Sequence, residues 1–204
     1  EQDQSKGGNG SQKERESGRM ILSAAIFDLD GTLIDSEPVY QASDREFLSR
    51  YGIELTAEDS TEFIGLDSRE IVRRLMEEHD IPGSHEDVLA EKNRMFLEAA
   101  AERVRAFPTV YALAERLAEM GFALAIATAT PVPIREEMVR LCGLERLFPV
   151  RVSADEVERG KPAPDVYLEA ARRLDVAPEA CIVLEDSQYG IRGARAAGMH
   201  VIAV

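Results

Sequence analysis

The second half of the chain alternates apolar strand-like stretches with helix-like stretches. The strand-like stretches read FALAIAT, FPVRVS, CIVLED and MHVIAV, and an earlier one, SAAIFDL, lies near the start of the apolar sequence. Between them lie helical patterns such as TVYALAERLAEMG, in which Thr109 is the expected N-cap and Gly121 the C-terminal stop. Parallel strands joined by helices need right-handed crossovers, which cover both faces of the sheet. The sequence therefore predicts an α/β fold built on a parallel sheet.

The stretch from residue 36 to residue 104 follows a different pattern. It contains three helical patterns and no strand pattern, so it predicts a separate helical module inserted into the α/β core, which then comprises residues 20–35 and 105–204. Residues 1–19 have no large apolar side chain, so they read as a disordered tail or a remnant of protein expression.

Composition limits the classes of partner. The chain has 204 residues and a formal net charge of -14, which disfavours nonspecific attraction to nucleic acid or to an anionic membrane. No stretch approaches the roughly 20 apolar residues of a membrane span, and the two cysteines, Cys142 and Cys181, read as reduced core residues. We expect a cytoplasmic protein, monomeric by default, whose partner is a small molecule.

Polar side chains follow several of the predicted strands where each strand ends. Asp28 follows the first strand, Thr128 closes FALAIAT, and Glu185 and Asp186 close CIVLED, while Lys161 follows a short strand in GKPAPD. In an open parallel sheet, ligands bind beyond the carboxyl ends of the strands. We therefore expect these side chains to converge on one site.

The acids of this set need a cation. Asp28 and Asp30 are two residues apart, so both carboxylates lie on one side of an extended chain. Together with Glu185 and Asp186 they would repel one another unless a cation offsets their charge, and an all-oxygen site of this kind suits Mg²⁺. Thr128 and Lys161 add donors for an anionic ligand, which completes an inventory suited to phosphoryl transfer.

Four motifs in order resemble those of the haloacid dehalogenase superfamily: DLDGTL, Thr128 at its strand end, GKPAPD, and LEDSQYGIRGARAAGM. The helical module after DGTLIDSEP is similar to the helical cap of the branch that contains sugar-phosphate phosphatases and β-phosphoglucomutases. The resemblance implies a Rossmann-like core with an inserted α-helical cap. It also implies that Asp28 is the nucleophile, that Asp30 is the general acid and base, and that Thr128 and Lys161 bind the phosphoryl group.

The same resemblance implies Mg²⁺ bound by the Asp28 side chain, the Asp30 carbonyl and Asp186, with Glu185 bound directly or through water. Within the superfamily, an acid at Asp30 favours phosphate-ester chemistry, so we expect a phosphatase for a small phosphorylated metabolite such as a sugar or polyol phosphate. A phosphomutase is the nearest alternative, although Ile64, Ser68 and Tyr40 depart from its pattern. A non-catalytic phospholigand or protein binder is a further alternative.

Four nearby residues keep two interpretations each. Thr130 and Ser187 could contact phosphate or could simply cap the helices that follow them. Asp35 and Glu37, at the start of the helical module, could make hinge hydrogen bonds or contact substrate.

Overall fold

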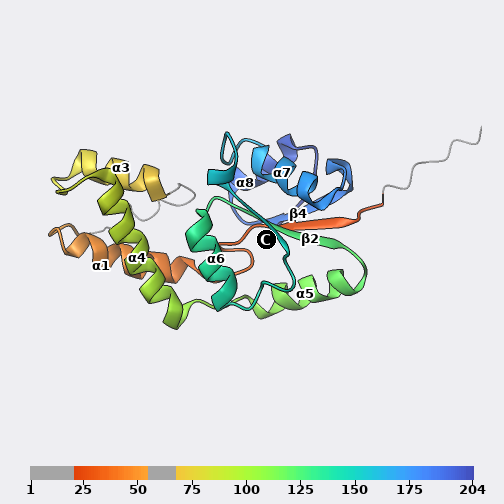
Figure 1. The fold of residues 1–204 in the computed structure, drawn as a ribbon, viewed down its shortest axis with the longest axis horizontal. Helices are drawn as coiled ribbons and strands as arrows, with labels where there is room; N and C mark the ends of the chain where they lie inside the picture. Colours follow the sequence, from red (N-terminus) through yellow and green to blue (C-terminus); the bar gives the residue numbers. More distant parts are fainter. Residues whose placement is uncertain (1–20, 55–67) are drawn as a thin grey trace, which may run out of the picture.

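A central sheet of five parallel strands organises the protein (Figure 1). The computed structural model describes residues 21–54 and 68–204, so the predicted tail and Ile64 lie outside the described residues. The strand order is β3-β2-β1-β4-β5, where the strands are β1 (Ala24–Phe27), β2 (Ala123–Thr128), β3 (Val150–Ser153), β4 (Cys181–Glu185) and β5 (His200–Ala203). Every pairing is parallel. The α/β fold predicted from the alternating pattern is therefore confirmed.

The central strand β1 is buried on both faces because helices cover each side. Its alternate residues divide between two apolar clusters, with Ala25 and Phe27 in one and Ala24 and Ile26 in the other. The first cluster takes in residues of the helices α5 (Pro108–Glu119) and α6 (Val132–Leu141), and the second takes in residues of α7 (Asp165–Leu174) and α8 (Gln188–Ala196). Short 3-10 turns at Ala154–Glu156 and Pro178–Ala180 precede α7 and β4, respectively.

The start of α5 differs from the expectation. Thr109 is not the N-cap, because the helix already begins at Pro108 and Phe107 occupies the N-cap position. Proline fits the first turn of a helix because its fixed φ is helical and its missing N–H would have no partner there. Gly121 ends the helix as expected, with a positive φ of 87°.

Three helices form the segment predicted as the helical module: α1 (Glu37–Ser49), α3 (Ser68–Glu78) and α4 (His85–Arg103), at the left of Figure 1. They share an apolar cluster of their own, made by Phe47, Leu48, Ile71, Val72, Leu75, Ile81, Val88 and Met95. Ser84 caps α4 by accepting a hydrogen bond from the Asp87 N–H. The described helices match the predicted pattern, and the boundaries 36–104 stay a prediction.

The two segments that connect these helices to the core lie side by side. The Asp35 N–H donates to the Arg105 carbonyl over 2.9 Å, and the Phe107 N–H donates to the Leu33 carbonyl over 2.9 Å. An antiparallel bridge between Ile34 and Ala106 completes the contact. The chain therefore enters and leaves the helical block at one point of the core.

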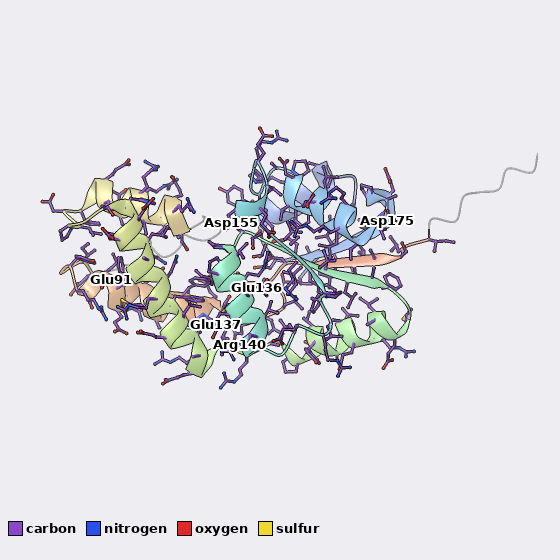
Figure 2. All side chains as sticks on the ribbon, viewed as in Figure 1. Glu91, Glu136, Glu137, Arg140, Asp155 and Asp175 are labelled. Carbon is purple, nitrogen blue, oxygen red and sulfur yellow. The ribbon has the colours of Figure 1, made fainter. Side chains whose placement is uncertain are left out.

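Most charged side chains lie on the outside of the helices. Figure 2 shows Glu91 on α4, Glu137 and Arg140 on α6, and Asp175 after α7. The Glu137 and Arg140 side chains pair within one helix, where Arg140 is exposed and Glu137 partly exposed, so the pair contributes little stability. No helix among the described residues is long and apolar enough to cross a membrane. The charged groups of interest for chemistry are instead the few that are buried.

Both cysteines are free thiols, as predicted. Burial raises the pKa of Cys142 and of Cys181 to about 11, so each is protonated at neutral pH. A protonated thiol is a poor nucleophile and a poor metal ligand, which fits the expected role in packing.

Candidate active site

The carboxyl ends of β1 and β4 place two acids around one ammonium group. Asp28 follows β1 directly, and Glu185 is the last residue of β4. Lys161, from the loop before α7, donates to Asp28 Oδ1 over 2.6 Å and to Glu185 Oε2 over 2.8 Å. All three side chains are at most 8 % exposed. The structure thus brings together three of the residues that the sequence singled out.

This buried triad keeps its lysine charged. Burial opposes the charge on Lys161, but the neighbouring Asp28, Tyr167 and Glu185 outweigh burial and raise the pKa of its ammonium. Burial also acts on Glu185, yet the attraction of Lys161 lowers the pKa of that carboxyl below its usual value. For Asp28 burial is the stronger effect, so its pKa is raised although Lys161 opposes the shift.

The Glu185 carboxylate is held on both oxygens. Oε2 accepts from Lys161 and from the Tyr167 hydroxyl over 2.7 Å, and Oε1 accepts from the Ser187 hydroxyl over 2.6 Å and the Ser187 N–H over 3.1 Å. Its side chain is fully buried. Direct metal binding by Glu185 stays a prediction, and these hydrogen bonds favour a role in fixing Lys161.

Gly190 makes room for Glu185 at the start of α8. A Cβ at this position would collide with the Glu185 carboxyl group. We expect Gly190→Ala to displace Glu185 and to lower the free energy of unfolding by about 1–3 kcal/mol, measured by urea unfolding. Arg195→Ala, at an exposed position of the same helix, is the control. Equal stability of the two variants would contradict the proposed steric role of Gly190.

Asp30 has a different environment from Asp28. Its Oδ2 accepts a short hydrogen bond from the Thr130 hydroxyl, whereas Oδ1 is buried and has no hydrogen-bond partner among the described residues. Burial raises the pKa of Asp30, and the Thr130 and Ser36 hydroxyls only partly oppose this effect. The two acids two residues apart are therefore unlike, since Asp28 is paired with a cation and Asp30 is next to neutral hydroxyl groups.

Asp186 lies next to the turn that follows β1. Its Oδ1 accepts from the Thr32 hydroxyl over 3.0 Å, and burial raises the pKa of the carboxyl. Gly31, with a φ of 77°, leaves the space that Asp186 occupies, because a Cβ there would collide with Oδ2. Carboxylate oxygens of Asp28, Glu185 and Asp186 all lie within 4.8 Å of one another. These hard oxygen donors fit a divalent cation such as Mg²⁺.

Other predicted residues have clear positions. Thr128 is buried at the end of β2, where its hydroxyl accepts the Thr130 N–H over 3.1 Å, and its contact with phosphate stays a prediction. Ser187 is the N-cap of α8 and accepts the Gly190 N–H over 3.0 Å, which favours the capping interpretation. The backbone of Asp35 makes a linker hydrogen bond, and its side chain is exposed.

Two residues of the site had no place in the sequence prediction. Tyr167 bonds Glu185, and its ring centre lies 5.2 Å from the Lys161 ammonium. Thr32 bonds Asp186. Tyr167 follows the apolar pattern of its helix, so the sequence indicates a core residue. Its position two residues after GKPAPD, the motif that contains Lys161, could have indicated that it lies near the site.

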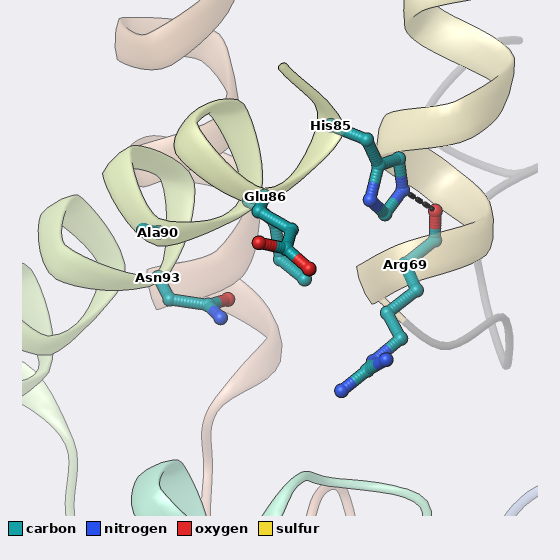
Figure 3. A pocket seen from close by; sticks show the side chains of 6 residues that line it. Arg69, His85, Glu86, Ala90 and Asn93 are labelled. Atoms are coloured by element: carbon teal, nitrogen blue, oxygen red, sulfur yellow. Dashed lines mark hydrogen bonds between the residues drawn. The ribbon is translucent and has the colours of Figure 1, made fainter.

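A hollow of about 310 Å³ lies between α3 and α4, apart from the buried acids (Figure 3). Figure 3 shows the His85 ring bonded to the Arg69 backbone, and His85 Nε2 lies 2.9 Å from the Arg69 carbonyl oxygen. Both polar and apolar side chains line this hollow: Arg69, His85, Glu86, Leu89, Ala90 and Asn93. The His85 ring therefore joins the start of α4 to the start of α3.

Known proteins share this arrangement over nearly the whole described chain. Residues 25–204 match the family described as "Haloacid dehalogenase-like hydrolase". A phosphorylated carbohydrates phosphatase of Thermotoga maritima is 37% identical over 185 residues, covering 89% of this chain and 84% of its own length. Hexitol phosphatase A of Escherichia coli is 37% identical over 182 residues, covering 88% of this chain and 81% of its own length.

Solved structures agree with the sequence relatives. CbbY from Rhodobacter sphaeroides, solved in complex with phosphate, has a TM-score of 0.82 and 30% identity, covering 90% of this chain and 86% of that chain. The match includes the strands and loops that carry Asp28, Lys161 and Glu185. The chain therefore belongs to the haloacid dehalogenase-like hydrolases.

Proposed function

We propose that the protein is a Mg²⁺-dependent phosphatase that hydrolyses a small phosphorylated sugar or polyol through an aspartyl-phosphate at Asp28. The observation that carries this proposal is the unlike pair of buried acids. Asp28 is held by the Lys161 ammonium at 2.6 Å, whereas the Thr130 hydroxyl, a neutral group, donates to Asp30 Oδ2. Family membership and the two phosphatase relatives support the same reaction class.

Asp28 is placed to act as the nucleophile. Lys161 holds Oδ1, which leaves Oδ2 to attack phosphorus in line with the leaving oxygen. The new bond joins Asp28 Oδ2 to phosphorus, and the bond from phosphorus to the sugar oxygen breaks. Lys161 also offers positive charge to the phosphoryl oxygens next to Asp28.

Asp30 is suited to move the proton. Burial raises its pKa, so a proton can reside on it nearer to neutral pH than on an ordinary carboxyl. In the first step Asp30 gives this proton to the departing sugar oxygen. In the second step it takes a proton from the water that attacks phosphorus, and the bond from phosphorus to Asp28 breaks to release phosphate.

The carboxylates of Asp28 and Asp186, with the Asp30 carbonyl, would hold Mg²⁺, and Glu185 would support the group through its hydrogen bonds to Lys161 and Ser187. When bound, Mg²⁺ would offset the negative charge of the acids and of the phosphoryl group. The carboxylates repel one another without a cation, since Glu185 raises the pKa of Asp28 and of Asp186.

A panel of phosphate esters tests the proposal directly. We expect the full chain with Mg²⁺ to release phosphate from hexose or hexitol phosphates and from p-nitrophenyl phosphate. EDTA should abolish turnover, and added Mg²⁺ should restore it. Lack of turnover on every ester would favour a binding protein. Isomerisation of a sugar phosphate that depends on an added sugar bisphosphate, without net phosphate release, would favour a phosphomutase.

A further inference from the structure

We infer that Thr130 is a positioning residue that selects which oxygen of Asp30 faces the reacting groups, and that Tyr40 links this selection to the helices α1 and α4. The inference rests on the proposed role of Asp30 as general acid and base. It assigns to Thr130 a role that differs from both interpretations open from the sequence, phosphate contact and plain helix capping.

Thr130 is fixed at both its backbone and its hydroxyl. It lies two residues after β2, is 7 % exposed, and donates its N–H to Thr128 Oγ1 over 3.1 Å. Its hydroxyl donates to Asp30 Oδ2. Asp30 Oδ1 is buried and has no hydrogen-bond partner in residues 21–54 and 68–204. Thr130 therefore holds Oδ2 of Asp30, while the buried Ser36 hydroxyl also acts on this carboxyl, so the hydrogen bond from Thr130 fixes which oxygen faces away from the reacting groups.

Tyr40 reaches this pair from the helical side. Its ring stacks on Phe96 of α4, with ring centres 3.9 Å apart and planes 12° from parallel. The Lys92 ammonium lies 5.9 Å from the centre of the Tyr40 ring and is itself paired with Asp44 at 2.6 Å. These contacts fix the Tyr40 ring relative to α1 and α4.

Tyr40 interacts with both Thr130 and Asp30. Burial is the main cause that raises the pKa of Tyr40, the negative charge of Asp30 adds to it, and hydrogen bonding with Thr130 opposes it. A chain of contacts thus runs from Phe96 through Tyr40 and Thr130 to Asp30.

The chemical consequence concerns the leaving group. A sugar alkoxide leaves phosphorus poorly unless it is protonated as the bond breaks, whereas p-nitrophenolate leaves without this help. Loss of the Thr130 hydroxyl would free Asp30 to rotate, so it should affect sugar phosphates much more than p-nitrophenyl phosphate. A residue that merely stabilised the fold would affect both esters equally.

The experiment compares kcat/KM of the full chain, with Mg²⁺, on the best sugar phosphate and on p-nitrophenyl phosphate, because kcat/KM reports the steps up to departure of the leaving group and not the later hydrolysis that both esters share. Thr130→Val keeps the shape of the side chain and removes the donor, whereas Thr130→Ser keeps the donor. General acid catalysis contributes about 10²–10⁴-fold, so we expect Thr130→Val to lower the ratio of kcat/KM on the sugar phosphate to kcat/KM on p-nitrophenyl phosphate by about 10-fold or more. Thr130→Ser should restore the ratio, and Tyr40→Phe should lower it less than Thr130→Val does.

Crystal structures of the wild type and Thr130→Val give a readout that does not need activity. We expect the Asp30 carboxylate to leave its wild-type orientation in the variant, with the melting temperatures of both proteins measured as a folding check. An unchanged Asp30 orientation, or an equal fall on both esters, would overturn the inference even though wild-type turnover upheld the proposed function. A wild type without turnover refutes the proposed function, and the catalytic part of this inference with it.

Discussion

Asp28→Asn is expected to lower kcat by about 10⁴-fold or more, because a neutral amide cannot replace the attacking carboxylate. The substitution keeps the shape of the side chain and removes the charge that Glu185 and Asp30 repel. Folding should therefore survive, and the melting temperature should stay within a few degrees of the wild type. Phosphate release from the best sugar phosphate measures the effect, and thermal unfolding serves as the folding check.

Asp175→Asn is the matched control for this prediction. Asp175 is exposed and caps the end of α7 with a positive φ of 57° (Figure 2), whereas Lys161 lies before the start of that helix. Asparagine tolerates this backbone conformation, so the control should keep wild-type turnover. If Asp28→Asn kept turnover comparable with that of Asp175→Asn, the covalent mechanism at Asp28 would be wrong.

Lys161→Met should produce the largest loss of stability. Lys161 is the cation between Asp28 and Glu185, so its removal leaves two buried carboxylates without a cation to pair with. Breaking a buried ion pair in this way costs about 3–5 kcal/mol. Turnover should also fall, because Asp28 and the phosphoryl group lose the positive charge beside them. Urea unfolding in EDTA at neutral pH measures the stability effect.

The stability loss in Lys161→Met should depend on pH. Without the ammonium, burial raises the pKa of Asp28 and Glu185 above their unfolded values, so the folded variant binds more protons than the unfolded chain as pH falls. The difference from the wild type should therefore be largest at neutral pH and shrink towards pH 5. A difference that stayed constant over this range would show that the lost charge is not the cause.

Arg135→Met separates the stability effect from the catalytic effect. Arg135 is also a buried cation, bonded to Ser153 at 2.8 Å and to Glu156 at 2.5 Å, and it has no part in the proposed mechanism. We expect this variant to lose stability while its folded form keeps wild-type turnover. Lys161→Met should lose both.

The sequence predicted that the site residues come together, because the ends of buried strands can be recognised from the amino-acid pattern. A buried parallel strand appears as an apolar run, and the polar residue that follows it lies at a known edge of the sheet. Asp28 and Glu185 were placed together on that ground alone, although 157 residues separate them, and the Lys161 contacts confirm their convergence.

The hydrogen-bond partners of the individual acids were not predictable from the sequence pattern. Which oxygen of Asp30 is held depends on a contact with Thr130, 100 positions away, and Thr130 was equally plausible as a cap. One hydrogen bond to Glu185 comes from the Tyr167 hydroxyl. In the sequence, Tyr167 fits the apolar pattern of its helix, so its polar role could not be predicted. The predicted start of α5 was wrong for a local reason. Proline is well suited to the first turn of a helix, so the helix begins at Pro108 and Thr109 lies inside it instead of capping it.

The paired linkers have a consequence for how such a protein can diversify. Leu33, Asp35, Arg105 and Phe107 bring the entry and exit of the intervening helices to hydrogen-bond distance, on the rim of a sheet whose strands do not depend on those helices for their pairing. Insertions and exchanges between two such adjacent anchor points leave the surrounding architecture intact. The helical block can therefore change in length or sequence between these anchor points while the pairing of the strands that carry Asp28 and Glu185 is kept.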